Sequence, residues 1–438
     1  MSDACKKHPR LFGSSVSISN KLVLVGAPAI GHRGKVYTYL IKSSTKKQSY
    51  DPISAFGGHD DDGFGISCKI YHKGSKCYYA LIGAHRNYEQ GVSIGAAYIF
   101  FTKNEGVTWT QHTKLLPPVS INNGYFGCSV DLIEGIAIVG SYGDNSNGLK
   151  SGSAHIYLNS GMSNPEGWFV AHSLYPDMYG ESINHCPEDK YNNTDYVNNY
   201  FGFSVNITEN YAVVGAPSER KGSAYLFYSS TLWANYSEDK RILVKKLENT
   251  RLNRFGFSVT ADGTKILIGA PGRDGVGGSS TLFSVDPYVL HPQMTLNIPD
   301  NISLSGKEFN TQCLSARSLF GRSTALLGNT ILVSGHGRTC ENNHVGSAFL
   351  YTSDTSLVDS SVTIEPITCL RDKVSKELFG HDIDISAEYV VIGDPSHEMV
   401  HVYDLITLKA NQKLKRWLAS DQKLLASDFF SYSINIHE

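Results

Sequence analysis

The chain has 438 residues, of which 18% are charged, and a formal net charge of −2 at pH 7. This balance gives no global positive potential and excludes an electrostatic argument for a nucleic-acid partner. The 41 Gly and only 5 Met residues are untypical of a helical protein. The composition is therefore unlike that of a helical protein. No stretch approaches the roughly 20 apolar residues of a transmembrane segment.

One pattern of sequence recurs seven times along the chain. Each copy has Phe-Gly, a Ser two residues later in six of the seven, an apolar strand, a short polar turn and a second apolar strand that ends in Gly-Ala-Pro or a related sequence. The copies begin at Phe12, Phe64, Phe126, Phe201, Phe255, Phe320 and Phe379. Their spacing is near that of known propeller blades.

Two further strands complete each copy. A third apolar run opens with Gly or a small residue, at 34–37, 95–98, 152–155, 222–225 and 346–349. A fourth strand is predicted before the next Phe-Gly, at 109–116, 168–174, 243–247 and 413–418. Four strands rich in β-branched and aromatic residues, with Gly, Asn and Asp between them, describe a blade. We therefore predict a seven-bladed β-propeller of four-stranded antiparallel blades, with residues 1–438 as a single domain.

These repeated segments resemble the FG-GAP repeat family, whose members form the seven-bladed propeller of integrin α-subunit heads. The resemblance extends from Phe12 to the C-terminus and implies a binding or cell-adhesion role. Integrin-type repeats often carry an Asp-x-Asp/Asn-x-Asp-Gly calcium loop between Phe-Gly and Gly-Ala-Pro. No such loop stands there, so the chain is closer to the calcium-free type of repeat, and we expect no cofactor and no metal. The acidic residues 59–63 could still bind an ion, but a solvated loop is the favoured interpretation.

The repeated residues are expected to be structural. A large ring that recurs once in each blade fills the seam between blades, and the repeated Gly residues stand where a Cβ would obstruct the backbone. The recurring Ser is expected to make a backbone hydrogen bond in each blade rather than to act as a nucleophile.

Closure of the ring is predicted from the C-terminal sequence. Residues 430–436 imitate strand one, which makes them an extra copy near the closure. We expect seven blades with the terminal segments meeting at the seam, so that the sheet has no open edge. An incomplete eighth blade is the alternative.

The cysteines and sequons leave the compartment open. Cys68 and Cys77 flank a hairpin turn and are a candidate disulfide if they are in register, with two buried thiols as the alternative. Sequons at Asn192, Asn206, Asn235 and Asn301 are about as numerous as chance gives. Residues 1–11 have no apolar core, so no secretory signal is expected. The family resemblance suggests an extracellular or surface location.

Loop lengths predict a binding face. The turns between strands one and two are short, whereas many connections from strand two to three and from strand four to the next strand one are long. Strand parity puts these two long classes on the same face, which we call the loop face. Unselected variation in loop length is the alternative.

Arginine recurs on the loop face shortly after the Gly-Ala-Pro position. A ring of guanidinium groups suits carboxylate, sulfate or phosphate groups, so an anionic ligand is one candidate. The candidate ligand-binding residues are Arg33, Arg86, Tyr88, Tyr142, Arg220, Arg273, His336 and Arg338. The alternative is that each Arg pairs with a local acid, such as Glu89 or Glu219, or lies in solvent.

The sequence therefore favours a non-catalytic binding or adhesion module that presents long loops to a protein or glycan. No common enzyme motif is present, and no catalytic residue is assigned. A hydrolase or lyase with a site at the central channel mouth is one alternative, because His381 and Asp382 replace the usual residues after Phe379-Gly380. A structural component of a surface layer or virion is another.

Overall fold

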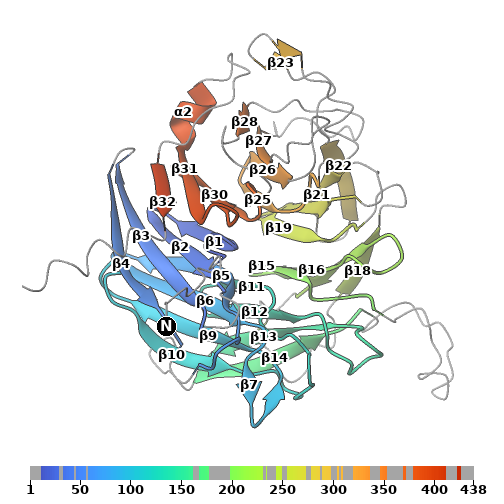
Figure 1. Cartoon of the computed structure of the whole chain (residues 1–438). Coiled ribbons are helices and arrows are strands. Elements are labelled where there is room, and N and C mark those ends of the chain that lie inside the picture. Colours follow the sequence, from blue (N-terminus) through green and yellow to red (C-terminus); the bar gives the residue numbers. More distant parts are fainter. Residues whose placement is uncertain are drawn as a thin grey trace, which may run out of the picture.

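A computed structural model shows seven antiparallel four-stranded sheets arranged around a central axis (Figure 1). This confirms the predicted seven-bladed propeller. The structure describes residues 11–28, 33–43, 46–55, 58–160, 167–176, 198–229, 233, 243–248, 254–272, 278–286, 289–296, 303–304, 307–308, 319–335, 346–352, 368–370, 378–410 and 422–425.

The blades follow one another in chain order, and six of the seven take four consecutive strands. The first four blades are β1 (Ser15–Ser19), β2 (Leu22–Ala27), β3 (Lys35–Ser43) and β4 (Lys46–Ile53); β5 (Phe64–Gly74), β6 (Cys77–Ala84), β9 (Ala96–Thr102) and β10 (Thr110–Leu115); β11 (Val130–Ile133), β12 (Ile136–Ser141), β13 (Ser153–Asn159) and β14 (Trp168–Leu174); and β15 (Ser204–Ile207), β16 (Tyr211–Ala216), β17 (Ser223–Tyr228) and β18 (Leu243–Glu248).

The remaining elements complete the ring. The last three blades are β19 (Ser258–Asp262), β20 (Lys265–Ala270), β21 (Ser279–Asp286) and β22 (Val289–Leu296); β25 (Thr324–Leu327), β26 (Thr330–Gly335), β27 (Ser347–Thr352) and β28 (Thr368–Leu370); and β29 (Ile383–Ile385), β30 (Tyr389–Asp394), β31 (Met399–Asp404) and β32 (Gln422–Leu425). Two small hairpins, β7 (Tyr88–Glu89) with β8 (Val92–Ser93) and β23 (Ser303–Leu304) with β24 (Lys307–Glu308), and the short helix α2 (Leu405–Ala410) lie outside the blades.

The first strand of every blade lies at the axis. Each of β1, β5, β11, β15, β19, β25 and β29 contacts the first strand of the next blade, and β29 contacts β1. Blade one is built entirely from residues 15–53 and blade seven from residues 383–425, so the described part of the ring closes by side-chain packing between blades. The predicted fourth strand at 413–418 and the extra copy at 430–436 lie outside the described residues; the fourth strand of blade seven is β32.

The Phe of each Phe-Gly is buried in a seam, as expected. Seven apolar clusters each join two neighbouring blades; the closing cluster packs Phe12 and Val16 of blade one with Val391 and Val402 of blade seven. The Phe rings also meet a ring on the third strand edge to face, for example Phe12 with Tyr37 at a centroid distance of 5.2 Å. The hydrophobic seams therefore hold neighbouring blades together.

The Gly of every Phe-Gly has a left-handed backbone, with φ between 83° and 92°. A Cβ on Gly127 would collide with the carbonyl oxygen of Ala96. In the preceding blade, a Cβ on Gly83 of the Gly-Ala-Pro position would collide with the carbonyl oxygen of Gly127. Two glycines thus allow the backbones of neighbouring blades to touch.

The recurring Ser makes the expected backbone bond. Its hydroxyl donates to the carbonyl oxygen of the next blade's Phe-Gly glycine over 2.9 to 3.0 Å, in Ser15, Ser67, Ser129, Ser204 and Ser258. In blade six the donor is instead Ser334, at 2.6 Å from the Gly380 oxygen, and Ser323 donates to Asp382. Each of these hydroxyls donates a hydrogen bond to a neighbouring blade, which agrees with a structural role.

We expect Gly127→Ala to destabilise the propeller by several times as much as Gly91→Ala. Both glycines have positive φ, 89° and 83°, so both variants acquire the left-handed strain of about 1–2 kcal/mol. Only Gly127 meets backbone atoms, whereas a Cβ on Gly91 has nothing within 4 Å. Urea unfolding of the two variants measures the difference. Equal losses would contradict the close approach of the blades.

Candidate binding site at the central channel

A cavity of about 410 Å³ lies on the axis and is lined by residues from the first strands of all seven blades. Two positions of each first strand supply most of the chemically varied side chains. One is the residue directly after Phe-Gly, and the other is the second residue after the recurring Ser. The first position lies near the loop face, because strand one starts there.

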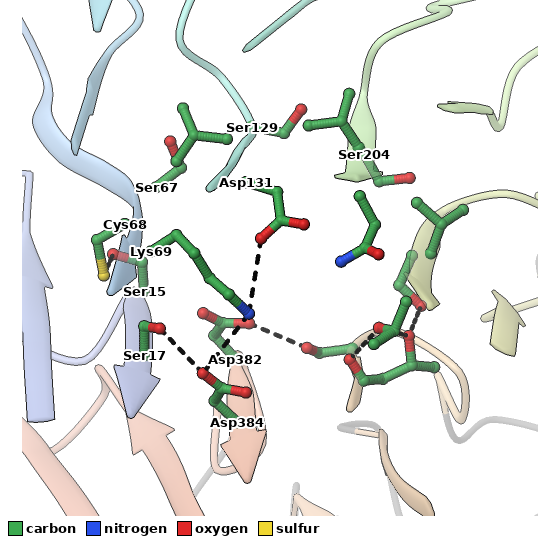
Figure 2. A pocket seen from close by; sticks show the side chains of 18 of the residues that line it. Ser15, Ser17, Ser67, Cys68, Lys69, Ser129, Asp131, Ser204, Asp382 and Asp384 are labelled. Carbon is green, nitrogen blue, oxygen red and sulfur yellow. Dashed lines mark hydrogen bonds and ion pairs between the residues drawn. The ribbon is translucent and has the colours of Figure 1, made fainter. Parts of the chain in front are cut away.

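A charged cluster occupies the deeper position. Lys69 of β5 extends toward Asp131 of β11 and Asp384 of β29 (Figure 2), and its Nζ lies 3.7 Å and 4.0 Å from their carboxylate oxygens. Asp384 and Asp131 raise the pKa of Lys69 above its usual value, against the effect of burial. Burial raises the pKa of Asp131. The lysine therefore stays charged and balances part of the negative charge in the channel.

The acids of the channel also join the blades. Asp131 accepts a hydrogen bond from the Ile207 amide at 2.8 Å, and Asp384 accepts one from the Ile18 amide at 2.9 Å. Asn206 makes the same kind of bond to the Ala261 amide at 3.0 Å. These acceptors satisfy buried N–H groups of the neighbouring first strand.

Asp382 takes the place of the recurring Ser in blade seven. Its carboxylate accepts hydrogen bonds from the Val16 amide at 2.8 Å and from the Ser323 hydroxyl at 2.9 Å, so one side chain contacts the blades on both sides of its own. Burial raises the pKa of Asp382 to about 6. Its oxygens are engaged in these contacts at the closing seam.

Arg322 and His381 follow the Phe-Gly of blades six and seven. Nη2 of Arg322 lies 3.1 Å from Nε2 of His381, and Nδ1 of the same ring lies 3.0 Å from the carbonyl oxygen of Ser14. Because a guanidinium only donates, Nε2 accepts and Nδ1 carries the proton. Burial, with a contribution from Arg322, lowers the pKa of His381 to about 4. The imidazole is therefore neutral at pH 7.

Aromatic rings surround the same end of the channel. Tyr125 and Tyr142 are stacked at 4.8 Å, and Tyr142 also meets Tyr200 and Phe203. Phe203 lies 4.8 Å from Phe257. We call these five residues the aromatic arc. They come from loops that enter strand one or leave strand two, which places the arc at the mouth on the loop face.

The predicted site residues are only partly brought together. Tyr142 lines the cavity, and Arg86 is close enough to it to affect its pKa. Arg33 is exposed and lies 3.9 Å from Asp60, Tyr88 is exposed in the β7–β8 hairpin, and Arg220 is exposed in the loop after β16. The predicted residues Arg273, His336 and Arg338 lie outside the described residues.

The local acids that could have paired with these arginines have other partners. Glu89 contacts Lys114, while Glu219 binds Lys246 at 2.6 Å and accepts the Tyr225 hydroxyl at 2.6 Å. In these contacts the partners of both acids are lysine and tyrosine side chains, not candidate arginines. The proposed anion-binding role of Arg86 and Arg220 remains a prediction.

The disulfide prediction is wrong. Cys68 and Cys77 are both free. Cys68 is opposite Ile82 in the hairpin, while Cys77 is opposite Gly74, so the two residues are out of register. The sequon at Asn206 carries a buried side chain inside the channel, which is not a position for a glycan.

The sequence reasoning missed Lys69, Phe257, Arg322 and Asp384. A signal was available, because each falls at a fixed offset from a recognisable Phe-Gly: either directly after it or two residues after the Ser position. Aligning the seven copies on these two offsets would have shown which side chains line the axis. Within the described residues, no three His, Cys, Asp or Glu side chains are grouped so as to hold a metal ion, and no helix there has the length and apolar character to cross a membrane.

The fold and its repeated inter-blade contact define a β-propeller. The FG-GAP repeat family matches residues 109–157 and 196–227, which include strands of blades two, three and four. The chain is thus a seven-bladed β-propeller with FG-GAP repeats in these two segments. The sequence matches no curated protein.

Several solved structures match the chain at low sequence identity. They include Hsv2 from Kluyvelomyces marxianus (8% identity, TM-score 0.45, 94% of this chain and 98% of that chain). The fucose-specific lectin from Aleuria aurantia has 9% identity and a TM-score of 0.40, over 80% of this chain and 94% of that one. The GH43 endo-arabinanase from Bacillus licheniformis has 9% identity and a TM-score of 0.33, over 80% and 97%. Similarity at this level carries no argument about function.

We expect Asp384→Ala to lower the free energy of unfolding by about 2–4 kcal/mol, because it leaves the Ile18 amide without its acceptor and removes one of the two carboxylates beside Lys69. Asp60→Ala is the matched control: Asp60 is an exposed acid 3.9 Å from Arg33, and such pairs contribute about 0–1 kcal/mol. Chemical unfolding at neutral pH measures both. A small loss in both variants would show that the ring does not depend on this acceptor.

We also expect acid to weaken the wild-type fold through His381. Its pKa is about 4 in the folded protein, below its ordinary value of 6.5. The stability that the neutral imidazole contributes is therefore complete above pH 6.5 and is lost as the pH falls toward 4. In His381→Gln the amide can still accept from Arg322 and donate to Ser14, but it does not titrate. Between pH 6.5 and pH 4, the free energy of unfolding of the variant should therefore fall by up to about 3 kcal/mol less than that of the wild type.

Urea unfolding between about pH 7 and pH 4.5 tests this expectation. Asp382, whose pKa is raised to about 6, adds stability as the pH falls, but it does so in both proteins and cancels from the comparison. His59→Gln, which changes an exposed imidazole, is the control and should follow the wild type. Identical pH profiles for wild type and His381→Gln would exclude the histidine as the cause.

Proposed function

We propose that this propeller is a non-catalytic binding module that receives a protein or glycan ligand at the channel mouth on its loop face. The observation that carries the proposal is the aromatic arc at the open end of a cavity of about 410 Å³. Cavities of a few hundred Å³ are typical of small-ligand sites, and this one combines aromatic rings with many polar side chains. The rings of the arc are half-buried, and aromatic rings with defined geometry give large contact areas at low entropic cost.

The groups that an enzyme would need are engaged elsewhere. Asp131, Asp382 and Asp384 accept hydrogen bonds from the backbone of neighbouring blades. Burial raises the pKa of the Cys68 thiol to about 12 and that of Cys128 to about 11, which opposes thiolate formation. These contacts favour binding over hydrolysis or elimination, and the proposed binding uses no metal cofactor.

The loop face also carries side chains that suit a partner. Arg86 is exposed beside the mouth, and Tyr88 is 47% exposed in the hairpin that projects from blade two. Tyr and Arg are enriched at energetically important positions of binding surfaces. An adhesion role would use this rim together with the channel mouth.

We expect Tyr142→Ala to weaken ligand binding by at least about tenfold, because a central aromatic contact is worth roughly 1.4 kcal/mol or more. A glycan array with neutral, sulfated and uronic acid members identifies the ligand, and titration of wild type and variant gives the change. Lys103→Ala is the control: this exposed lysine lies in the turn after β9, on the opposite face. Unchanged affinity in Tyr142→Ala, or no binding to the array, would contradict a glycan ligand at the mouth.

A further inference from the structure

We infer that Arg322, supported by Phe257 and His381, is a receptor for the acidic group of a saccharide, so that the ligand of the channel mouth is an acidic glycan. This inference rests on the proposed binding function and names its ligand class. The seven blades carry different residues directly after Phe-Gly. The residues directly after Phe-Gly are Ser14, Ile66, Cys128, Phe203, Phe257, Arg322 and His381. Arg322 is the permanent charge in this set, and all seven line the cavity or its mouth.

The guanidinium is fixed in place. Its Cζ lies 5.2 Å from the ring centroid of Phe257, and Nη2 donates to Nε2 of His381 at 3.1 Å. The histidine is held in turn by the Ser14 carbonyl oxygen at 3.0 Å. A cation stacked on one ring and bonded to another loses little side-chain freedom when it binds a ligand.

One donor of this guanidinium is unused. Within the described part of the chain, Nε of Arg322 is buried and has no hydrogen-bond partner. A buried N–H without an acceptor is unfavourable, because the group has lost its hydrogen bond to water. An arginine offers N–H groups in a planar fork that matches the two oxygens of a carboxylate. Because Arg322 lines the cavity, the group most complementary to its guanidinium is an acid with two acceptor oxygens.

The charges around the mouth favour an anion. Burial lowers the pKa values of Arg322 and His85, and the nearby Arg254 and Arg86, respectively, lower them further. The acid that faces Arg322 is Asp382, whose carboxylate is bound by the Val16 amide and the Ser323 hydroxyl. The deeper acids share the channel with Lys69. Positive charge thus collects at the mouth and negative charge lies further along the axis.

The aromatic arc indicates that the ligand contains a sugar ring. Phe203 and Phe257 lie side by side at 4.8 Å, next to Tyr142. Together with a cavity of about 410 Å³, these rings fit one or two sugar rings that stack while the acidic substituent meets Arg322. A single acidic side chain of a protein partner would need the guanidinium but not this volume. The shared chemistry is a pyranose that carries a carboxylate or a sulfate.

Calorimetric titration with trigalacturonic acid, its methyl ester, a neutral galactotriose and a sulfated disaccharide tests the inference on the whole chain. We expect the wild type to bind an acidic probe at least about tenfold more tightly than the uncharged ones, and salt to weaken that binding. Binding of the uronic acid or of the sulfated probe identifies which acid is used. Equal affinity for acidic and uncharged probes, or no binding of either acidic probe, would overturn the inference.

A variant separates geometry from charge. Arg322→Lys keeps the positive charge but not the planar fork, and we expect it to lose at least about tenfold in affinity for the acidic probe. Lys103→Arg is the control, since it exchanges the same two residue types at an exposed position after β9, on the opposite face. Urea unfolding verifies that both variants are folded. If Arg322→Lys does not fold, the comparison of the acidic probe with its methyl ester on the wild type still decides the question.

The two proposals fail differently. If Tyr142→Ala weakens binding but Arg322→Lys and esterification of the probe do not, the mouth is a binding site without an acid receptor, and only the present inference is wrong. If an acidic saccharide binds the wild type and neither variant changes its affinity, the ligand binds elsewhere and both proposals are wrong.

Discussion

The backbones of neighbouring blades touch at a pair of glycines, and the rest of the propeller depends on this contact. A Cβ on Gly83 would collide with the Gly127 carbonyl oxygen of the next blade, and the Ser67 hydroxyl donates to that same oxygen at 2.9 Å. Any side chain at either glycine would separate the blades. The contact therefore fixes both the distance between blades and the direction in which each first strand leaves the loop face.

This geometry explains why the variable residues collect at the axis. With Phe-Gly and Ser committed to the seam, the residue between Gly and Ser and the second residue after Ser are free to differ among blades. They supply Arg322 and Phe257 near the mouth and Lys69 with Asp384 deeper in the channel. The repeat thus provides a constant frame, and a few positions per blade determine the chemistry of the cavity.

Departures from the repeat are matched by changes in their neighbours. Ser334 replaces the Gly of Gly-Ala-Pro in blade six, and its hydroxyl donates to Gly380 at 2.6 Å. Ser323 no longer makes that bond and donates to Asp382, which also accepts the Val16 amide across the closing seam. The last blades, which match the repeat least well, thus keep hydrogen bonds to their neighbouring blades through other side chains.

The sequence by itself determined the blade count, the buried Phe, the special glycines and the structural Ser, because each is a local requirement repeated at a regular spacing. It also placed the long loops on one face. Only the tertiary structure decided that Lys69, Asp131 and Asp384 meet, that Arg322 stacks on Phe257, and that Cys68 and Cys77 are out of register. These outcomes depend on distances between different blades and on strand register, and a linear spacing specifies neither, because closure of the ring brings residues from distant repeats to the same axis.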